Sequence, residues 1–213
     1  MRLILGLIFA SLAGSVWAET EVSVYGGQQW ASPSRVTVAG DSVIPDAVFD
    51  QDWAGYAYEW PIYVGARLTK WLPSDFGYGA EYVHNKAVPP DRVLPAGYRA
   101  LEFSDGLNSL TLNGYRRWPD ALGQFTPYVG VGAGISFPGV EIRYAGSNTY
   151  EYQITGIAAT WMAGLRYPLS QRWTGFAEYR GSYSTNLVRL ETGGTLDTNI
   201  ATGAINIGLN FGF

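Results

Sequence analysis

The last nine residues of the chain, Ile205 to Phe213, read INIGLNFGF. Apolar side chains occupy every second position, and asparagine or glycine occupies the positions between them. Because successive side chains of a β-strand point to opposite faces, this period of two predicts a strand with one apolar and one polar face. The strand ends the chain on an aromatic residue, Phe213. Such a closing strand is typical of bacterial outer-membrane β-barrels, whose outer face meets lipid.

The first 18 residues have the pattern of a secretory signal peptide. Arg2 supplies a positive start, Leu3 to Ala13 is a short apolar run, and Val16-Trp17-Ala18 resembles a cleavage site. No other apolar run approaches the roughly 20 residues that a spanning helix needs. We therefore expect a signal peptide over residues 1–18, cleaved after Ala18, followed by one outer-membrane β-barrel domain over residues 19–213.

Further segments repeat the period-two alternation, and most are longer than ordinary globular strands. With the closing strand they predict an all-β chain that forms an eight-stranded antiparallel up-and-down transmembrane barrel. The candidate strands run over roughly 19–29, 54–72, 76–87, 106–118, 125–137, 153–169, 173–186 and 198–213. A soluble lipocalin-like barrel is the alternative, and it would bury the aromatic side chains in a ligand cavity.

The connections between these segments alternate between short and long. Short periplasmic turns and long external loops are the outer-membrane pattern, and an even number of strands leaves both termini periplasmic. Aromatic residues beside the short turns predict a periplasmic girdle of Trp71, Phe76, Trp118, Phe125, Tyr167, Trp173, Phe211 and Phe213. An outer girdle is expected from Trp53, Tyr56, Tyr58, Trp60, Tyr144, Tyr150 and Tyr152.

Eight strands enclose a lumen that side chains fill, so the barrel is expected to be a plug and not a diffusion pore. The polar positions that alternate with the apolar ones predict a nearly charge-balanced interior of Arg67, Glu81, Asn113, Arg166, Glu178, Arg180, Asn206 and Asn210. We expect these groups to stabilise the lumen by ion pairs and hydrogen bonds. Function is then expected at the outer rim, in the loops or on the lipid-facing wall.

Composition excludes several classes of function. The net charge is −4, which does not favour nucleic acid, and the chain contains no cysteine and one histidine. Thiolate-ligated metals and a site with two histidines and one carboxylate are therefore excluded within one chain. We expect a monomer in contact with outer-membrane lipid and lipopolysaccharide. We also expect the barrel-insertion machinery to recognise this protein through the strand that ends in Phe213.

One group of residues can carry chemistry. His84 lies near the outer end of the third candidate strand, and Glu102, Ser104 and Asp105 lie near the outer end of the next. A neutral imidazole beside a serine and a carboxylate suits an outer-leaflet acyl hydrolase. The plainer alternative is a histidine in contact with solvent or lipid headgroups.

The loops offer charged groups as well. The acidic residues of the first loop are Asp41, Asp46, Asp50 and Asp52, followed by Glu59. They can bind divalent cations that bridge lipopolysaccharide phosphates, or simply form an acidic exposed loop. Basic residues that can meet the phosphates directly are Arg35, Lys86, Arg92, Arg99 and Arg143.

Several segments resemble those of the alphaproteobacterial outer-membrane barrels called lipid A oxidases. These segments are Ser23-Val24-Tyr25-Gly26-Gly27, Tyr58-Glu59-Trp60-Pro61, Leu101 to Asn108, Leu110 to Asn113, Arg116 to Pro119 and Thr126 to Gly130. The resemblance implies an enzyme that oxidises the proximal glucosamine of lipid A to an aminogluconate with molecular oxygen. It transfers no catalytic residue to this chain.

Oxygen activation usually requires a redox metal or an organic cofactor. A divalent metal such as manganese, held by His84, Glu102 and Asp105, is the hypothesis that the sequence allows. Three functions thus remain open. They are lipid A oxidation, a non-enzymatic role in envelope integrity, adhesion or surface interaction, and acyl hydrolysis.

Overall fold

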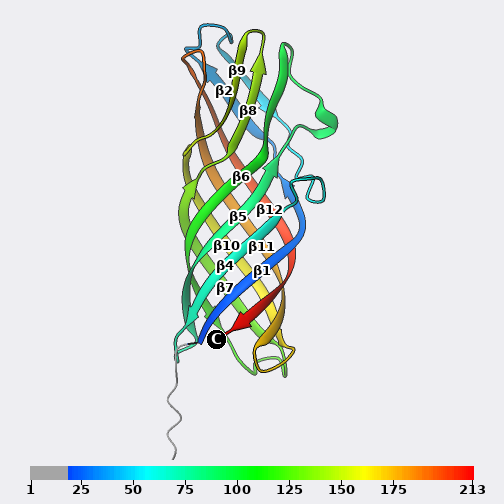
Figure 1. The fold of residues 1–213 in the computed structure, drawn as a ribbon, viewed down its shortest axis with the longest axis vertical. Coiled ribbons are helices and arrows are strands. Elements are labelled where there is room, and N and C mark those ends of the chain that lie inside the picture. Colours follow the sequence, from blue (N-terminus) through cyan, green and yellow to red (C-terminus); the bar gives the residue numbers. More distant parts are fainter. Residues whose placement is uncertain (1–18) are drawn as a thin grey trace, which may run out of the picture.

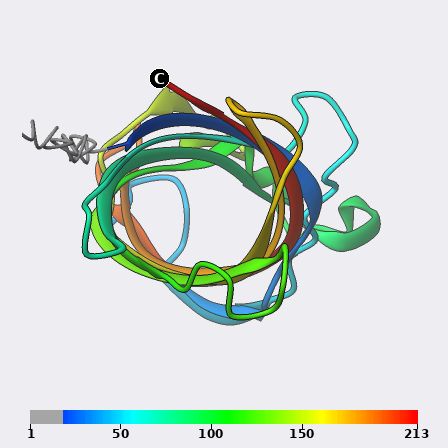
Figure 2. The ribbon, with the colours of Figure 1, turned by 90° about the horizontal axis from the view of Figure 1, so that it is seen from below.

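The computed structural model describes residues 19–213, and the expected signal peptide lies outside the described residues. Eight antiparallel strands close into a tall barrel (Figures 1 and 2), which confirms the predicted fold. These strands are β1 Glu19–Ala31, β4 Val64–Trp71, β5 Phe76–Ala87, β6 Tyr98–Arg117, β7 Thr126–Ser136, β10 Gly156–Pro168, β11 Trp173–Arg189 and β12 Thr195–Gly212. The ring closes where β1 pairs with β12, from Glu21 opposite Gly212 to Ala31 opposite Thr202.

Alternation along β12 shows how the sequence builds the wall. Asn206 and Asn210 are buried and point inward, whereas Ile207 between them is 73% exposed on the outside. The polar groups therefore find partners in the lumen, and the apolar side chains form the face that lipid covers. No helix among residues 19–213 is long and apolar enough to cross a bilayer.

The second predicted strand is shorter than expected. Residues 54–63 form turns, and β4 begins at Val64. The apparent alternation there was misleading because Pro61 lacks a backbone N–H and Tyr56 has a positive φ of 38°. Trp60, which falls within the strand predicted over residues 54–72, instead lies on a loop and is 87% exposed.

Two of the predicted long loops contain strands that continue the wall upward (Figure 1). The hairpin of β2 (Ser34–Ala39) and β3 (Ala47–Gln51) adds to the edge of β12. The hairpin of β8 (Gly139–Tyr144) and β9 (Ser147–Tyr152) adds to the upper part of β6. A single 3-10 turn, η1 (Pro90–Arg92), lies in the loop between β5 and β6.

The upper extension has its own apolar core. Its buried side chains are Ala31, Val36, Val38, Ile44, Trp53, Ala87, Leu101, Phe103, Leu107, Val140, Ile142, Val188, Leu190, Leu196 and Ile200. The prediction that Trp53 and Tyr144 belong to an outer girdle was therefore wrong. Trp53 is 4% exposed, donates to Ser34 Oγ at 2.7 Å and packs on Phe103, because it lies inside the extension that the sequence did not predict. Tyr144 is half-buried against the same core.

The lower interior is polar and is ringed by aromatic side chains. Arg67 donates to Glu81 at 2.6 Å and to Glu178 at 3.0 Å, and Arg180 pairs with Glu81 at 3.3 Å. Tyr25 and Asn113 also donate to Glu81. All eight side chains predicted to point inward are buried. The void that remains near Arg67 measures about 10 Å³, so side chains fill the lumen.

The end with the short turns carries the predicted aromatic girdle, with one correction. Phe125 packs on Tyr167 and Trp173 packs on Phe211, with ring centroids 5.2 and 5.0 Å apart. Trp71 was predicted in the girdle but is 3% exposed, because its indole N–H donates to Glu21 Oε2 inside the barrel at 2.7 Å. Both β1 and β12 reach this end of the molecule (Figure 1).

Candidate functional site

The structure places His84, Glu102 and Asp105 on the outward side of the upper parts of β5 and β6, and no hydrogen bond among the described residues joins His84 to either carboxylate. His84 follows Tyr82 at the spacing of one face, and Glu102 lies between two side chains of the upper core, so both point outward. We call the group the outer-wall cluster, and its members are His84, Arg92, Glu102, Asp105, Glu141 and Arg143.

A bulge in β6 positions the cluster. Between the pairs Asn85–Leu107 and Ala87–Phe103, β5 advances two residues while β6 advances four. The extra residues project outward, as bulges commonly re-aim side chains. Gly106 takes a φ of +107° there, and a Cβ at this position would lie 2.4 Å from His84 Nδ1. Only glycine therefore allows the imidazole to pack against the bulge.

Hydrogen bonds orient the imidazole of His84. Its Nδ1 lies 2.9 Å from Asn108 Oδ1, which also accepts a hydrogen bond from Tyr82. The amide of Asn108 is itself oriented, because its Nδ2 donates to the carbonyls of Asp105 and Gly106. Nδ1 of His84 is therefore the protonated nitrogen of the neutral ring. Nε2 is buried and has no hydrogen-bond partner among the described residues.

Carboxylates crowd the upper part of the cluster. Glu102 and Glu141 face each other directly across the β6–β8 pair. Burial raises the pKa of Glu141; Arg143 opposes this shift, and the charges of Glu102 and Asp105 add to it. Arg143 pairs with Glu141 at 2.5 Å and Arg92 with Glu102 at 3.5 Å, while Ser104 donates to Glu102.

The guanidinium groups of the two arginines in the cluster remain largely exposed to solvent. The side chain of Arg92 is 66% exposed and that of Arg143 is 53% exposed, whereas their carboxylate partners are 14% and 17% exposed. Guanidinium groups in this state can accept a second anionic partner from outside the protein. The cluster therefore combines exposed cations, partly buried carboxylates and one imidazole.

Lys86 organises the loop beside the cluster. Its ammonium donates to the carbonyl of Tyr56 at 3.2 Å and to that of Glu59 at 3.0 Å, and the residue is 2% exposed. The Lys86 ammonium is therefore buried and bonded to backbone carbonyls, and the expectation that it meets phosphates directly was wrong. The loop it holds carries Tyr58 and Trp60, which are 74% and 87% exposed. Exposed aromatic side chains of this kind are typical of a membrane–water interface.

Several of the remaining charged groups suggested by the sequence are used within the loops. Asp41 accepts hydrogen bonds from the N–H groups of Val43 and Ile44, and it binds the hydroxyl of Thr192 at 2.7 Å. Asp50 pairs with Arg35 at 3.3 Å. The contact between Asp41 and Thr192 joins the first and last external loops, and the others lie within the first loop, so Asp41 and Asp50 have a structural role here.

The geometry bears on the two catalytic hypotheses. Among residues 19–213 no hydrogen bond joins Ser104 to His84, since Ser104 bonds Glu102 and His84 Nδ1 is committed to Asn108. The described residues also contain no group of three or more histidine, aspartate or glutamate side chains arranged to hold a metal ion. The donors of the outer-wall cluster therefore do not fit the metal that the oxidase hypothesis implies.

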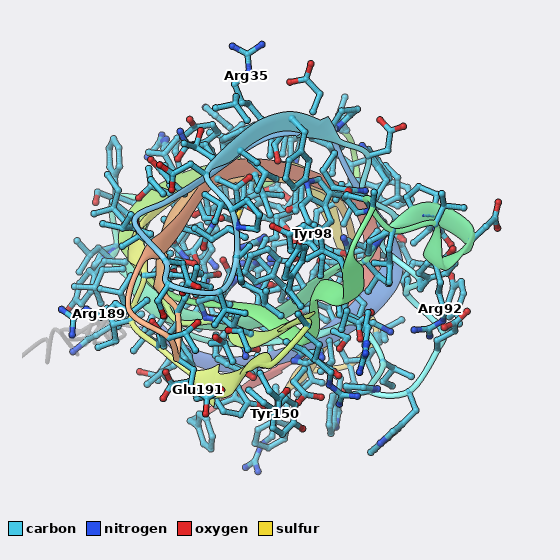
Figure 3. All side chains as sticks on the ribbon, turned by 90° about the horizontal axis from the view of Figure 1, so that it is seen from above. Arg35, Arg92, Tyr98, Tyr150, Arg189 and Glu191 are labelled. Carbon is cyan, nitrogen blue, oxygen red and sulfur yellow. The ribbon has the colours of Figure 1, made fainter. Side chains whose placement is uncertain are left out.

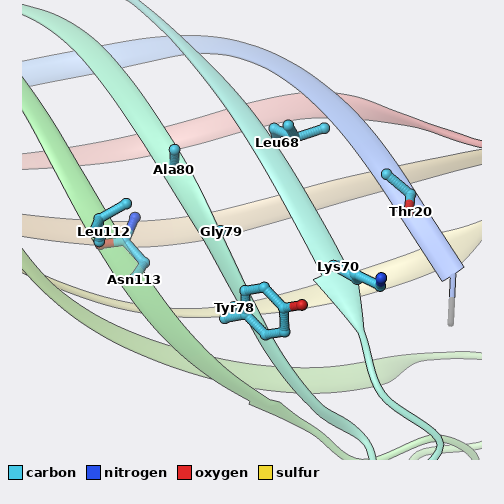
Figure 4. A pocket seen from close by; sticks show the side chains of 8 residues that line it. All are labelled: Thr20, Leu68, Lys70, Tyr78, Gly79, Ala80, Leu112 and Asn113. Atoms are coloured by element: carbon cyan, nitrogen blue, oxygen red, sulfur yellow. The ribbon is translucent and has the colours of Figure 1, made fainter.

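A separate hollow of about 550 Å³ lies lower on the lipid-facing wall (Figure 4). The small residues Gly79 and Ala80 leave space there between Leu68 and Leu112, and Lys70 and Tyr78 lie at its lower side. Its position in the spanning wall and its apolar lining suit lipid chains. It brings no set of polar groups together.

Comparisons with known proteins define the fold. No protein-family model matches the sequence, and no curated protein matches it. The structure is similar to AlkL in lipid bilayers, with a TM-score of 0.55, 14% identity, and 99% of this chain and 97% of AlkL covered. It is also similar to the Neisserial surface protein NspA, with a TM-score of 0.51, 14% identity, and coverage of 91% and 97%.

Pseudomonas aeruginosa OprG is similar as well, with a TM-score of 0.50, 10% identity, and coverage of 91% and 96%. At these identities the likeness shows the fold alone. The chain has the fold of a small integral outer-membrane β-barrel, and the resemblance to lipid A oxidases stays a prediction.

Sequence reasoning missed Glu141 in the outer-wall cluster. Glu141 lies on β8, in a segment predicted to be a loop, beside Arg143, which the sequence had suggested as a phosphate ligand. Asn108 was visible as the outward neighbour of His84 once the two strands are set in register, but a hydrogen-bonding amide carries no spacing signal of its own.

Proposed function

We propose that the chain is an integral outer-membrane β-barrel that acts by surface interaction, with the outer-wall cluster binding the phosphorylated sugar headgroup of lipopolysaccharide. The observation that carries the proposal is the position of the cluster. It lies on the outside of a filled barrel, directly above the apolar face of β5 and β6. Leu110 and Leu112, 46% and 74% exposed, mark this face on β6.

The chemistry of the cluster suits such a headgroup. The exposed guanidinium groups of Arg92 and Arg143 can pair with phosphate, and Glu102 and Asp105 can accept hydrogen bonds from sugar hydroxyls. Tyr150 donates to Asp105 at 2.7 Å and is 60% exposed, so its ring offers a face for the sugar. The proposed role is non-enzymatic.

A titration of the purified, folded barrel with lipid A tests the proposal. The double variant Arg92→Gln, Arg143→Gln should weaken binding by about 30-fold, since each of the two lost charge-assisted contacts contributes on the order of 1 kcal/mol. The matched control is Arg172→Gln, an exposed arginine at the opposite end of the barrel, which should leave binding unchanged. Equal affinity of wild type and double variant would overturn the proposal.

Lipid A oxidation is the second candidate, and it rests on the resemblance of several sequence segments to lipid A oxidases. Mass spectra of lipid A from cells that express the folded barrel, grown with and without air, distinguish the two. A gain of one oxygen that depends on air supports oxidation. Unchanged lipid A, in a host whose lipid A has the acceptor form, supports binding alone.

A further inference from the structure

A second hollow lies on another side of the outer wall, beneath the exposed side chain of Arg189. Figure 3 shows Arg189 and Arg92 on opposite sides of the barrel, so this hollow is separate from the outer-wall cluster. It has a volume of about 580 Å³. We call it the Arg189 groove, and it is lined by Glu151, Gln153, Ile154, Thr155, Leu187, Arg189 and Thr195.

The groove lies where β11 extends further up the wall than the strand beside it, β10. β11 continues to Arg189, but its pairing with β10 begins only at Ala158 opposite Ser184. The connection between β9 and β10 fills the place of the missing pairs. Leu187 donates from its N–H to the carbonyl of Thr155 at 2.9 Å, and the amide of Gln153 bonds both the N–H and the carbonyl of Arg189.

The lining of the groove is divided by polarity. Ile154 and Leu187 are 74% and 53% exposed, and the outward face of the wall continues below them with Ile157 and Tyr183. Arg189 and Glu151 are charged, exposed groups at the rim. An amphiphile can therefore place its chains against the wall while its headgroup meets the two charges.

The two rim charges remain available. No ion pair within residues 19–213 involves Arg189 or Glu151, and the carboxylate of Glu151 accepts one hydrogen bond, from Gln153 Nε2 at 2.9 Å. Gln153 thus links the main chain of Arg189 to the side chain of Glu151 and sets their relative placement. One cation and one anion on one rim complement a headgroup that carries both signs.

We propose that the Arg189 groove binds a membrane lipid whose headgroup carries a phosphate and a primary ammonium. Arg189 binds the phosphate, Glu151 binds the ammonium, and Ile154 and Leu187 contact the chains. This site is independent of the proposed role of the outer-wall cluster, because neither charge at the rim belongs to that cluster.

Native mass spectrometry of the delipidated barrel tests the site with two lipids that have identical chains, phosphatidylethanolamine and phosphatidylglycerol. Wild type should retain one phosphatidylethanolamine about tenfold more strongly than phosphatidylglycerol. Arg189→Gln should lose retention of both lipids. Glu151→Gln should keep phosphate binding and retain the two lipids equally.

Arg172→Gln serves as the matched control and should behave as wild type. Heat-modifiable electrophoretic mobility verifies that each variant is folded. Equal retention of the two lipids by wild type, or a preference for phosphatidylethanolamine that survives in both groove variants, would overturn the proposal.

Discussion

Two charged assemblies of this barrel contain the same kinds of residue and differ in how they are enclosed. Inside, the ion-paired side chains of Arg67, Arg180, Glu81 and Glu178 are at most 5% exposed. Outside, Arg92 and Arg143 are more than half exposed, Glu102 faces Glu141, and Nε2 of His84 has no partner. The buried, charge-balanced network stabilises the lumen. The exposed outer-wall cluster can still bind a charged ligand from outside the protein.

The largest expected effect is on the inner network. Arg67→Met leaves Glu81 and Glu178 without their shared cation, and an uncompensated buried charge costs about 3–5 kcal/mol. Urea unfolding in detergent, followed by tryptophan fluorescence, measures the loss. Arg92→Met is the outer counterpart and should change the free energy of unfolding by less than about 1 kcal/mol. Equal losses for the two variants would remove the distinction between the assemblies.

A backbone substitution in the β6 bulge should have the next largest effect. Gly106→Ala places a Cβ against His84 and forces a non-glycine residue to a φ of +107°, which costs about 1–3 kcal/mol. Gly114→Ala, on the same strand with no heavy atom within 4 Å of the added Cβ, is the control. The same unfolding measurement applies. A Gly106 variant as stable as the Gly114 variant would contradict the proposed packing.

Removal of the Lys86 ammonium should release the aromatic loop. Lys86→Met leaves the carbonyls of Tyr56 and Glu59 without their donor, a loss of about 1–2 kcal/mol in loop stability. Because the chain has no cysteine, a spin label at Trp60→Cys reports loop motion directly by electron paramagnetic resonance. Its spectrum should sharpen in the Lys86 variant, while a label at Val48→Cys on β3 should not change. A Trp60 label with unaltered mobility would argue against this role for Lys86.

The smallest expected effect concerns the pair of facing carboxylates. Burial raises the pKa of Glu141, Arg143 opposes the shift, and the charges of Glu102 and Asp105 add to it, so Glu102→Gln should lower that pKa. A raised pKa in the folded state stabilises the fold below the pKa of the unfolded chain, and this contribution is lost as pH rises through the folded pKa. In the Glu102 variant the folded pKa of Glu141 should lie closer to that of the unfolded chain, so the stabilisation should be lost over a narrower range of pH.

Carbon-13 NMR titration of the Glu141 carboxyl measures the change. Asp46→Gln, a change in the first loop, should leave the Glu141 titration unchanged. A pKa of Glu141 that stays the same or rises in the Glu102 variant would show that the two carboxylates do not interact.

The alternation of side chains predicted the barrel because each residue of a spanning strand faces either lipid or the lumen. Apolar residues face lipid and polar residues face the lumen, so the polarity of a residue indicates its direction. The extension above the membrane lacks this rule. Val36 and Val38 line a core there because β2 pairs with β12, a long-range contact that local sequence does not specify. The sequence predicted Trp53 and Trp71 in the aromatic girdles, and both predictions were wrong for a related reason. An indole can lie at the lipid interface or be buried where its N–H has a hydrogen-bond acceptor.

Part of the candidate site could also be predicted from the sequence. His84 and Asp105 lie near the outer ends of adjacent strands, so strand order alone brings them to one side of the barrel. The contribution of Glu141 depends on the β8–β9 hairpin, and the orientation of His84 depends on a bulge and on Asn108. These features arise from tertiary pairing and leave no periodic signal.

The most direct test of the account uses the only histidine of the chain, because its imidazole gives a single unambiguous nitrogen-15 resonance pair. The measurement is the spectrum of the barrel in nanodiscs during a titration with lipid A. The account predicts an Nδ1-protonated ring whose Nε2 resonance shifts saturably with lipid A, and a much weaker response in the Arg92→Gln, Arg143→Gln variant. A His84 resonance that ignores lipid A would contradict the assignment of the outer-wall cluster as the binding site.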